Sequence, residues 1–219
     1  MQFLRVLWWR FRYALWRLPW RLMFSVAHWR TFDGIRVGVF DVWEDRIEAQ
    51  VFEKIEAAFK LMAAYEPRRL QRAARDIRRL WITRAAYAAA YYLQAWDMCV
   101  IDVKFVTDEH TTPAKVAAVL VHEATHARLF KCGIRYTEAA RHRIETLCVA
   151  ESAFFARKLP DGEALARYVV ECHPSDPGHW SDDNLNRQML DAKLQEVEEA
   201  SLPPWLKRVL RRVLVSRAA

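Results

Sequence analysis

The sequence has no apolar run long enough to span a membrane. A helix that crosses the hydrocarbon core needs about 20 consecutive, mostly apolar residues, and charged residues interrupt every candidate stretch of this 219-residue chain. The first residues also lack the pattern of a secretory signal, because Arg residues divide each apolar segment and no small-residue cleavage site follows. We therefore expect no transmembrane helix and a cytoplasmic protein.

Cysteine is scarce, and its spacing argues against a disulfide framework. The four cysteines form no Cys-x-x-Cys pair, and three of them have apolar neighbours; they are Cys99, Cys132, Cys148 and Cys172. We expect buried thiols in a reducing compartment. Internal repeats and low-complexity tracts are also absent, and a hydrophobic content of 53% excludes a disordered chain.

Basic charge is concentrated at the two ends of the chain. The net charge is +7, residues 1–30 contain six Arg, and residues 203–219 contain five basic residues. All 27 acidic residues lie between these two segments. The sequence therefore predicts three parts: a basic N-terminal helix over 1–30, a single domain over 31–202, and a basic C-terminal helix over 203–219.

The first segment, residues 1–30, is predicted to be a Trp-rich amphipathic helix with two apolar stripes. One stripe holds Leu4, Leu7, Trp8, Phe11, Leu15, Leu18 and Leu22, and the other holds Trp9, Tyr13, Trp16 and Trp20. Trp rings and Arg side chains together suit a membrane interface. We favour peripheral attachment to an anionic membrane surface, which for a cytoplasmic protein is the inner face. The alternative is that the helix packs on the body of the protein.

The last segment, residues 203–219, is predicted to be a simpler amphipathic helix. Its apolar face holds Leu206, Val209, Leu210, Val213 and Leu214, and its basic face holds Lys207, Arg208, Arg211 and Arg212. Packing on the domain and binding to a membrane remain equally open for this helix. Nucleic acid is the weaker candidate partner for both ends, because no recognition motif accompanies the charge.

The domain between the ends is expected to be α+β and mostly α-helical. Apolar periodicity predicts helices over 44–66, from 67 onward, 113–132, 137–158 and 184–200. Alternating or β-branched residues predict strands over 35–42, 81–82 and 98–106, residues 85–96 are ambiguous, and 173–186 reads as a loop. The strands would form a small sheet packed against the helix at 113–132.

The most informative stretch is His122-Glu123-Ala124-Thr125-His126. Residues four apart lie on one face of a helix, so the two imidazoles can hold one metal ion beside the Glu123 carboxylate. The surrounding helix is almost wholly apolar and is bounded by Pro113 and Gly133. Buried polar side chains need partners, so we favour a metal over a pair of hydrogen-bonded core histidines.

A catalytic zinc site takes three protein ligands, and the sequence offers two candidates for the third. Glu145 and Glu151 both lie on the helix predicted over 137–158, and we favour Glu145 because its separation from His126 allows a return along an antiparallel helix. The other carboxylate would orient a His ring or pair with an Arg. Cys132 is interpreted as a packing residue.

The motif followed by a helical Glu resembles the gluzincin clan of zinc metallopeptidases over roughly residues 98–160. The segment from Glu151 to Pro160 is also similar, with a different spacing, to the ImmA/IrrE-type peptidases. The Asp that thermolysin-like members place four residues after the ligand Glu is replaced here by Val149. The resemblance implies a zincin-like core.

The resemblance further implies that His122, His126 and Glu145 bind one Zn²⁺ and that Glu123 is the general base for hydrolysis of a peptide bond. A nearby Tyr or His would assist, and the candidates are Tyr136, His142, His173 and His179. We expect a narrow range of substrates, which would be intracellular proteins or peptides. Two alternatives are a zinc-binding protein without turnover and a metal-free adaptor at the membrane surface.

Overall fold

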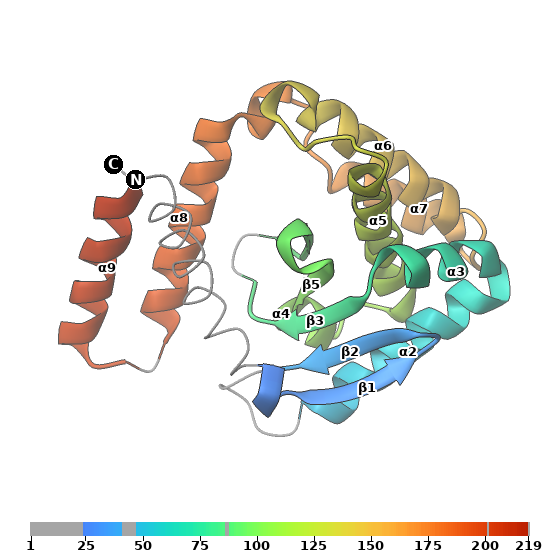
Figure 1. The fold of residues 1–219 in the computed structure, drawn as a ribbon, viewed down its shortest axis with the longest axis horizontal. Coiled ribbons are helices and arrows are strands. Elements are labelled where there is room, and N and C mark those ends of the chain that lie inside the picture. The colour runs from blue at the N-terminus through green and yellow to red at the C-terminus, as the bar shows by residue number, and fades with distance from the viewer. Residues whose placement is uncertain (1–23, 41–46, 86–87, 201, 219) are drawn as a thin grey trace, which may run out of the picture.

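The structure is a computed structural model that describes residues 24–40, 47–85, 88–200 and 202–218 (Figure 1). Helices dominate these residues, and a five-stranded mixed sheet lies among them. The prediction of a mostly helical α+β protein is therefore confirmed. Most of the predicted helix over 1–30 lies outside the described residues, and its last three residues belong to the first strand, where Trp29 pairs with Gly38.

The sheet has the strand order β1-β2-β3-β5-β4. Its strands are β1 (His28–Phe32), β2 (Ile35–Val39), β3 (Arg79–Thr83), β4 (Ala90–Leu93) and β5 (Met98–Asp102). The three central strands are parallel, and the edge strands β1 and β4 run antiparallel to their neighbours. Asp33 and Gly34 join β1 to β2 with φ angles of 47° and 83°, and a two-residue hairpin turn favours such positive values.

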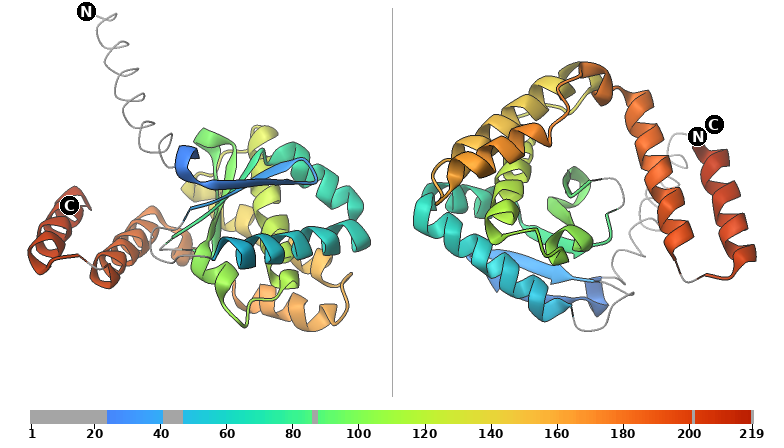
Figure 2. Two further views of the ribbon diagram at one scale, coloured as in Figure 1. Left: turned by 90° about the horizontal axis from the view of Figure 1, so that it is seen from below. Right: turned by 180° about the vertical axis from the view of Figure 1, so that it is seen from behind.

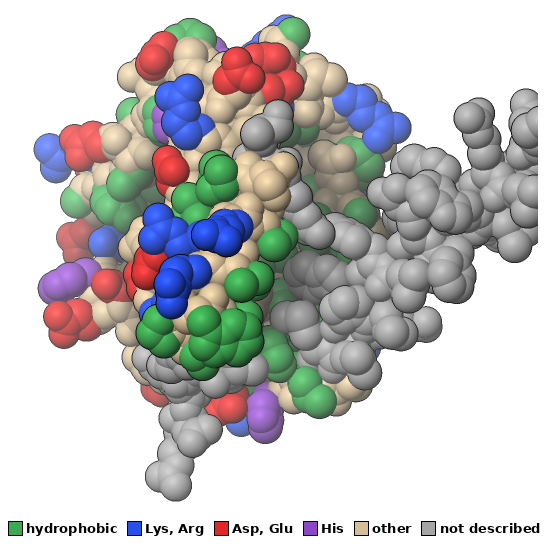
Figure 3. Space-filling view, turned by 90° about the vertical axis from the view of Figure 1, so that its left-hand side faces the viewer, with side chains coloured by type: hydrophobic (Ala, Val, Ile, Leu, Met, Phe, Trp, Pro, Cys, Tyr) green, Lys and Arg blue, Asp and Glu red, His purple; other side chains and the backbone are tan. Residues whose placement is uncertain are grey.

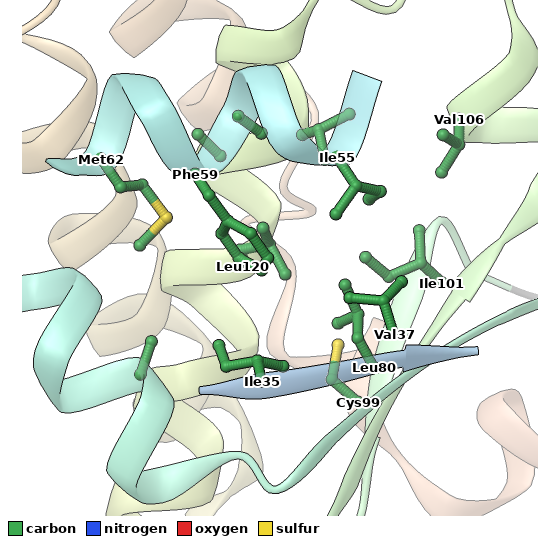
Figure 4. Packing of buried hydrophobic residues seen from close by; sticks show 14 of the residues in the cluster. Ile35, Val37, Ile55, Phe59, Met62, Leu80, Cys99, Ile101, Val106 and Leu120 are labelled. Atoms are coloured by element: carbon green, nitrogen blue, oxygen red, sulfur yellow. The ribbon is translucent and has the colours of Figure 1, made fainter. Parts of the chain in front are cut away.

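One face of the sheet packs against α2 (Glu48–Tyr65) and α5 (Pro113–Lys131) and forms the main core. Figure 4 shows strand residues such as Leu80 and Ile101 pointing toward Ile55 and Phe59 of α2 and Leu120 of α5. These side chains are almost fully buried. Burial of each large apolar side chain stabilises the fold by roughly 1.5–3 kcal/mol, so this core fixes α5 against the sheet.

Aromatic side chains cover the opposite face of the sheet. Trp81 lies at its centre, and the ring of Phe24 contacts it edge-on with a centroid distance of 4.7 Å. Trp29 and Phe40 also pack on Trp81. A Cβ at Gly38 would lie 2.8 Å from Trp29 and 2.9 Å from Trp81, so only glycine lets the two rings approach this closely.

Three more helices extend the body around α5. They are α3 (Pro67–Asp76), α6 (Glu138–Ala156) and α7 (Gly162–Glu171). Helix α6 packs along α5, and the Ser152 hydroxyl donates a hydrogen bond of 3.0 Å to the Ala118 carbonyl. Helix α7, which the sequence did not predict, packs on α6 through Ala166.

The last two helices form a hairpin on the opposite side of the molecule from α3 (Figures 1 and 2). Helix α8 (Asp182–Glu199) has no buried residue, and α9 (Pro204–Ala218) packs along it. Polar contacts hold both ends of α8: Asp182 lies 2.6 Å from Arg141 of α6, and Glu199 lies 2.7 Å from Lys104 and 3.2 Å from Arg84. Helix α8 therefore bridges two distant parts of the body.

The predicted strand over 98–106 is wrong in its second half. Strand β5 ends at Asp102, and residues Val103–Thr107 form the short helix α4. The Asp102 side chain accepts a hydrogen bond of 3.2 Å from the Lys104 backbone N–H, which caps the helix. A local cap therefore outweighs the strand preference of the β-branched residues that follow it.

The ambiguous segment 85–96 provides edge strand β4 and a short 3-10 helix, η1 (Gln94–Trp96). The region predicted as a loop contains a second 3-10 helix, η2 (Pro177–Trp180), and α8 begins at Asp182 within it. Among the described residues, no helix is long and apolar enough to cross a membrane.

Candidate metal centre

Helix α5 carries the His122–His126 motif, and both of its ends have residues that favour a helix boundary. The Thr112 side chain caps it by accepting from the Lys115 backbone N–H at 3.3 Å, and Pro113 occupies the first turn. Past its end, Gly133 adopts a φ of 85°, which suits glycine. The helix is continuous through the motif, so His122 and His126 share one face.

The two histidine rings meet a carboxylate from the neighbouring helix. The Nε2 atoms of His122 and His126 lie 3.1 Å apart. From α6, one carboxylate oxygen of Glu145 lies 3.2 Å from His122 Nε2, and the other lies 3.4 Å from His126 Nε2. The structure thus brings together the three residues that the sequence proposed as metal ligands.

The distances within this triad match those between ligands on a tetrahedral zinc ion. Zinc binds nitrogen and oxygen at about 2.0–2.1 Å, so two ligands on one ion are separated by about 3.3 Å. The three distances between His122, His126 and Glu145 run from 3.1 to 3.4 Å. Imidazole and carboxylate are also donors that zinc accepts. The residues present therefore fit a zinc ion.

Cys148 is a fourth candidate ligand that the sequence analysis missed. His122, His126 and Cys148 form a group that could hold a metal ion, with all three ligand atoms within 4.8 Å of one another. Cys148 follows Glu145 by three residues on α6, so the two side chains lie on adjacent faces of the helix. The three-residue spacing from Glu145 is the sequence feature that could have identified Cys148 as a candidate ligand. Burial raises the pKa of the Cys148 thiol, and the nearby Glu145 raises it further.

Tyr136 holds the carboxylate of Glu145 from the other side. Its hydroxyl donates a short hydrogen bond to Glu145 Oε1, and its ring lies edge-on to that of His126 at 5.5 Å. Burial raises the pKa of Tyr136, as does the charge of Glu145, so the phenol stays protonated as a donor. Burial alone would raise the pKa of Glu145, but the bonds to His122 and His126 outweigh it and lower the pKa.

Glu123 is buried beside the triad and keeps one oxygen free. Its side chain is only 4% exposed, and the backbone N–H of Tyr92 in β4 donates to it. Within the described part of the chain, Oε2 has no hydrogen-bond partner. Burial raises the pKa of Glu123 to about 7, although His122 opposes the shift. A buried carboxyl group with a free oxygen and a pKa near neutrality is suited to accepting and releasing a proton.

These groups open into a cavity of about 570 Å³. Edge strand β4 forms one wall and the first half of α8 forms another, where the contributing side chains are Leu185, Gln188 and Met189. A smaller hollow of about 210 Å³ adjoins His122 and Glu123. Its lining is mostly apolar and includes Phe105, Val119, Val149 and Val169. The site therefore has space on two sides of Glu123.

Three of the four predicted helper residues line the larger cavity: Tyr136, His173 and His179. The ring of His173 stacks on Trp180 with a centroid distance of 5.0 Å, and its buried Nε2 has no partner among the described residues. Burial lowers the pKa of His173, which keeps the ring neutral near pH 7. His142 lies outside the cavity lining, although it is on the same helix as Glu145.

The competing carboxylate, Glu151, lies elsewhere. It forms a salt bridge with Arg69 of α3 and lines a separate hollow behind α5. The predicted partner of this carboxylate was either a metal or an Arg, and in the structure it is Arg69. Cys132 is exposed at the C-terminal cap of α5, so the interpretation of Cys132 as a packing residue is wrong.

Comparison with known proteins gives no relative for this chain. No protein-family profile matches it, and neither curated proteins nor solved structures give a significant match. The evidence for function therefore comes from the residues of the site itself.

Proposed function

We propose that the protein is a zinc-dependent peptidase. The observation that supports this most strongly is the triad of His122, His126 and Glu145, whose donor atoms lie 3.1–3.4 Å apart beside the free oxygen of Glu123. A bound zinc ion would supply two kinds of chemistry, a lowered pKa of a water molecule and polarisation of a carbonyl oxygen. The residues around it would handle the proton and the substrate.

Glu123 is the residue that moves the proton. Its free Oε2 accepts a proton from the attacking water and later donates it to the leaving amine. Burial raises the pKa of Glu123 to about 7, and the positive charge of a bound zinc ion would lower it again, which favours the carboxylate that accepts the proton. The Tyr92 backbone N–H donates a hydrogen bond to the other carboxylate oxygen, which holds Oε2 in one orientation.

The walls of the site favour a peptide as substrate. Strand β4 is at the edge of the sheet, pairs only with β5 among the described strands and lines the cavity, although the Tyr92 N–H on its outer edge already donates to Glu123. An extended peptide can add to such an edge by backbone hydrogen bonds. The apolar hollow beside Glu123 then accepts an apolar side chain next to the scissile bond.

His173 is the best-placed group to contact the oxygen that becomes negative during hydrolysis. It lines both hollows, and its Nε2 is buried without a partner in the described structure. A neutral imidazole can donate a hydrogen bond to a developing oxyanion. The Tyr136 hydroxyl donates its hydrogen bond to Glu145, so Tyr136 orients that carboxylate and does not contact the oxyanion.

Substitution of Glu123 by Gln separates metal binding from hydrolysis. The variant should retain about one zinc ion per chain, because Glu123 is not among the ligands, while its rate of peptide hydrolysis should fall by about 10²–10⁴-fold. Zinc is measured by elemental analysis, and hydrolysis by mass spectrometry of a peptide library. The variant His142→Ala, outside the cavity, is the control. Unchanged hydrolysis in Glu123→Gln would contradict the proposed mechanism.

A second pair of variants tests whether Glu145 or Cys148 is the third metal ligand. We expect Glu145→Ala to weaken zinc binding by more than about a hundredfold and Cys148→Ala to weaken it by less than about tenfold. Competition with a chromophoric chelator measures both affinities. The opposite order would assign the metal to His122, His126 and Cys148.

A further inference from the structure

Helix α9 exposes an apolar stripe to solvent. Trp205, Val209 and Val213 are spaced four residues apart and are 62%, 48% and 42% exposed. The leucines on the neighbouring face are half-buried, and α9 packs along α8; these leucines are Leu206, Leu210 and Leu214. The two valines and the three leucines were predicted to share one face, whereas in the structure the valines are exposed and the leucines are half-buried.

A basic stripe runs beside the exposed apolar one. Arg208 and Arg212 each lie one position before an exposed valine, and neither has an acidic partner among the described residues. Arg211, farther around the helix, lies 2.6 Å from Glu198 of α8 and is therefore already paired. Figure 3 shows Lys and Arg side chains next to hydrophobic ones on the face that this hairpin presents.

We propose that α9 binds an anionic lipid surface. A helix that lies in a membrane interface buries an apolar face of Trp and aliphatic residues, while adjacent cations meet lipid phosphates. Trp205 stands at the start of α9, where its ring can lie at headgroup depth. The exposed stripe supplies the apolar part of this interaction, and Arg208 and Arg212, which have no acidic partner in the described part of the chain, supply the charged part.

Charge argues against the other possible occupants of this face. Residues 1–23 of the same chain carry five Arg and no acid, so they would repel α9, and a second copy of α9 would repel it for the same reason. A nucleic acid would satisfy the arginines but leave Trp205, Val209 and Val213 in water. An anionic lipid surface accepts both kinds of side chain.

The charge component is tested by vesicle flotation of the full chain. Vesicles contain phosphatidylcholine alone or phosphatidylcholine mixed with phosphatidylglycerol. We expect binding to the anionic vesicles only, weakened about 30-fold in Arg208→Gln/Arg212→Gln. The control Arg143→Gln/Arg167→Gln removes the same charge from exposed sites on α6 and α7 and should change binding less than about twofold. An equal loss of vesicle binding in both double variants would show that binding depends only on net charge, and it would overturn the proposal.

The apolar component is tested with a matched pair of valines. Val209 on α9 and Val170 on α7 are 48% and 50% exposed. We expect Val209→Gln to weaken binding to anionic vesicles about fivefold and Val170→Gln to leave it unchanged. Circular dichroism confirms that each variant is folded. If Val209→Gln binds like the parent, α9 does not enter the interface, and binding through another segment such as residues 1–30 would replace the proposal.

Discussion

The carboxylate of Glu123 is buried with one oxygen lacking a hydrogen-bond partner in the described structure, which a purely structural role does not require. It accepts the Tyr92 backbone N–H, while Oε2 is buried without a hydrogen-bond partner in the described structure. An unsatisfied buried carboxylate oxygen costs stability, and sites of function are where such a cost persists. The same reasoning applies to the unpartnered Nε2 of His173.

Tyr136 orients Glu145, and its hydroxyl can be removed without removing the ring. We predict that Tyr136→Phe weakens zinc binding by about 10–100-fold, the usual effect of losing a hydrogen bond to a metal ligand. The measurement is zinc affinity by chelator competition, with the exposed Tyr168→Phe as control. Equal affinities in parent and Tyr136→Phe would show that the bond to Glu145 plays no part in holding the ligand.

The choice between Glu145 and Glu151 illustrates what sequence could and could not predict. Both residues were identified as candidates, but they lie about 120° apart around α6. Which one faces His122 depends on how α6 rotates as it packs on α5, and that rotation follows from contacts along the whole helix. Cys148 was overlooked because an apolar neighbourhood makes a thiol look like a core residue.

At the scale of elements, sequence periodicity predicted the long helices well. The buried helix with the motif and the following helix both appear close to their predicted bounds, because their apolar patterns and capping residues agree. Short elements were less predictable. Strand β5 ends at Asp102 because of one side-chain cap, and β4 exists because β5 offers it an edge to pair with.

Arg141 connects α6 to the segment that covers the cavity. Its guanidinium donates to the Trp180 carbonyl at 2.5 Å and to Asp182 at 2.6 Å, and it also lies over the ring of Tyr136. It therefore fixes the start of α8 beside the metal triad. Sequence could not indicate this contact, because the partners lie about forty residues apart.

Replacing Arg141 with Met tests this connection. We expect the free energy of unfolding to fall by about 1–3 kcal/mol, because charged hydrogen bonds are lost and the Trp180 carbonyl loses its donor. Amide hydrogen exchange over 177–189 should also become faster. The exposed neighbour Arg143→Met should change stability by less than about 0.5 kcal/mol. Unchanged exchange over 177–189 in Arg141→Met would show that other contacts hold the segment.

At the scale of the whole molecule, α8 links the two proposed activities. Its first half lines the cavity through Leu185, Gln188 and Met189, and the same helix supports α9. Its ends are fixed to the body by Asp182 and Glu199. The proposed lipid-binding helix therefore packs on the helix that lines the cavity, and we propose a membrane-proximal peptide as the substrate.

The most direct test of the central claim is diffraction at the zinc absorption edge from crystals of protein purified without chelator. We predict one anomalous peak at about 2.0–2.2 Å from the Nε2 atoms of His122 and His126 and from a carboxylate oxygen of Glu145. Absence of a peak at this position would contradict the zinc site. A peak bonded to Cys148 with Glu145 turned away would contradict the assignment of the third ligand.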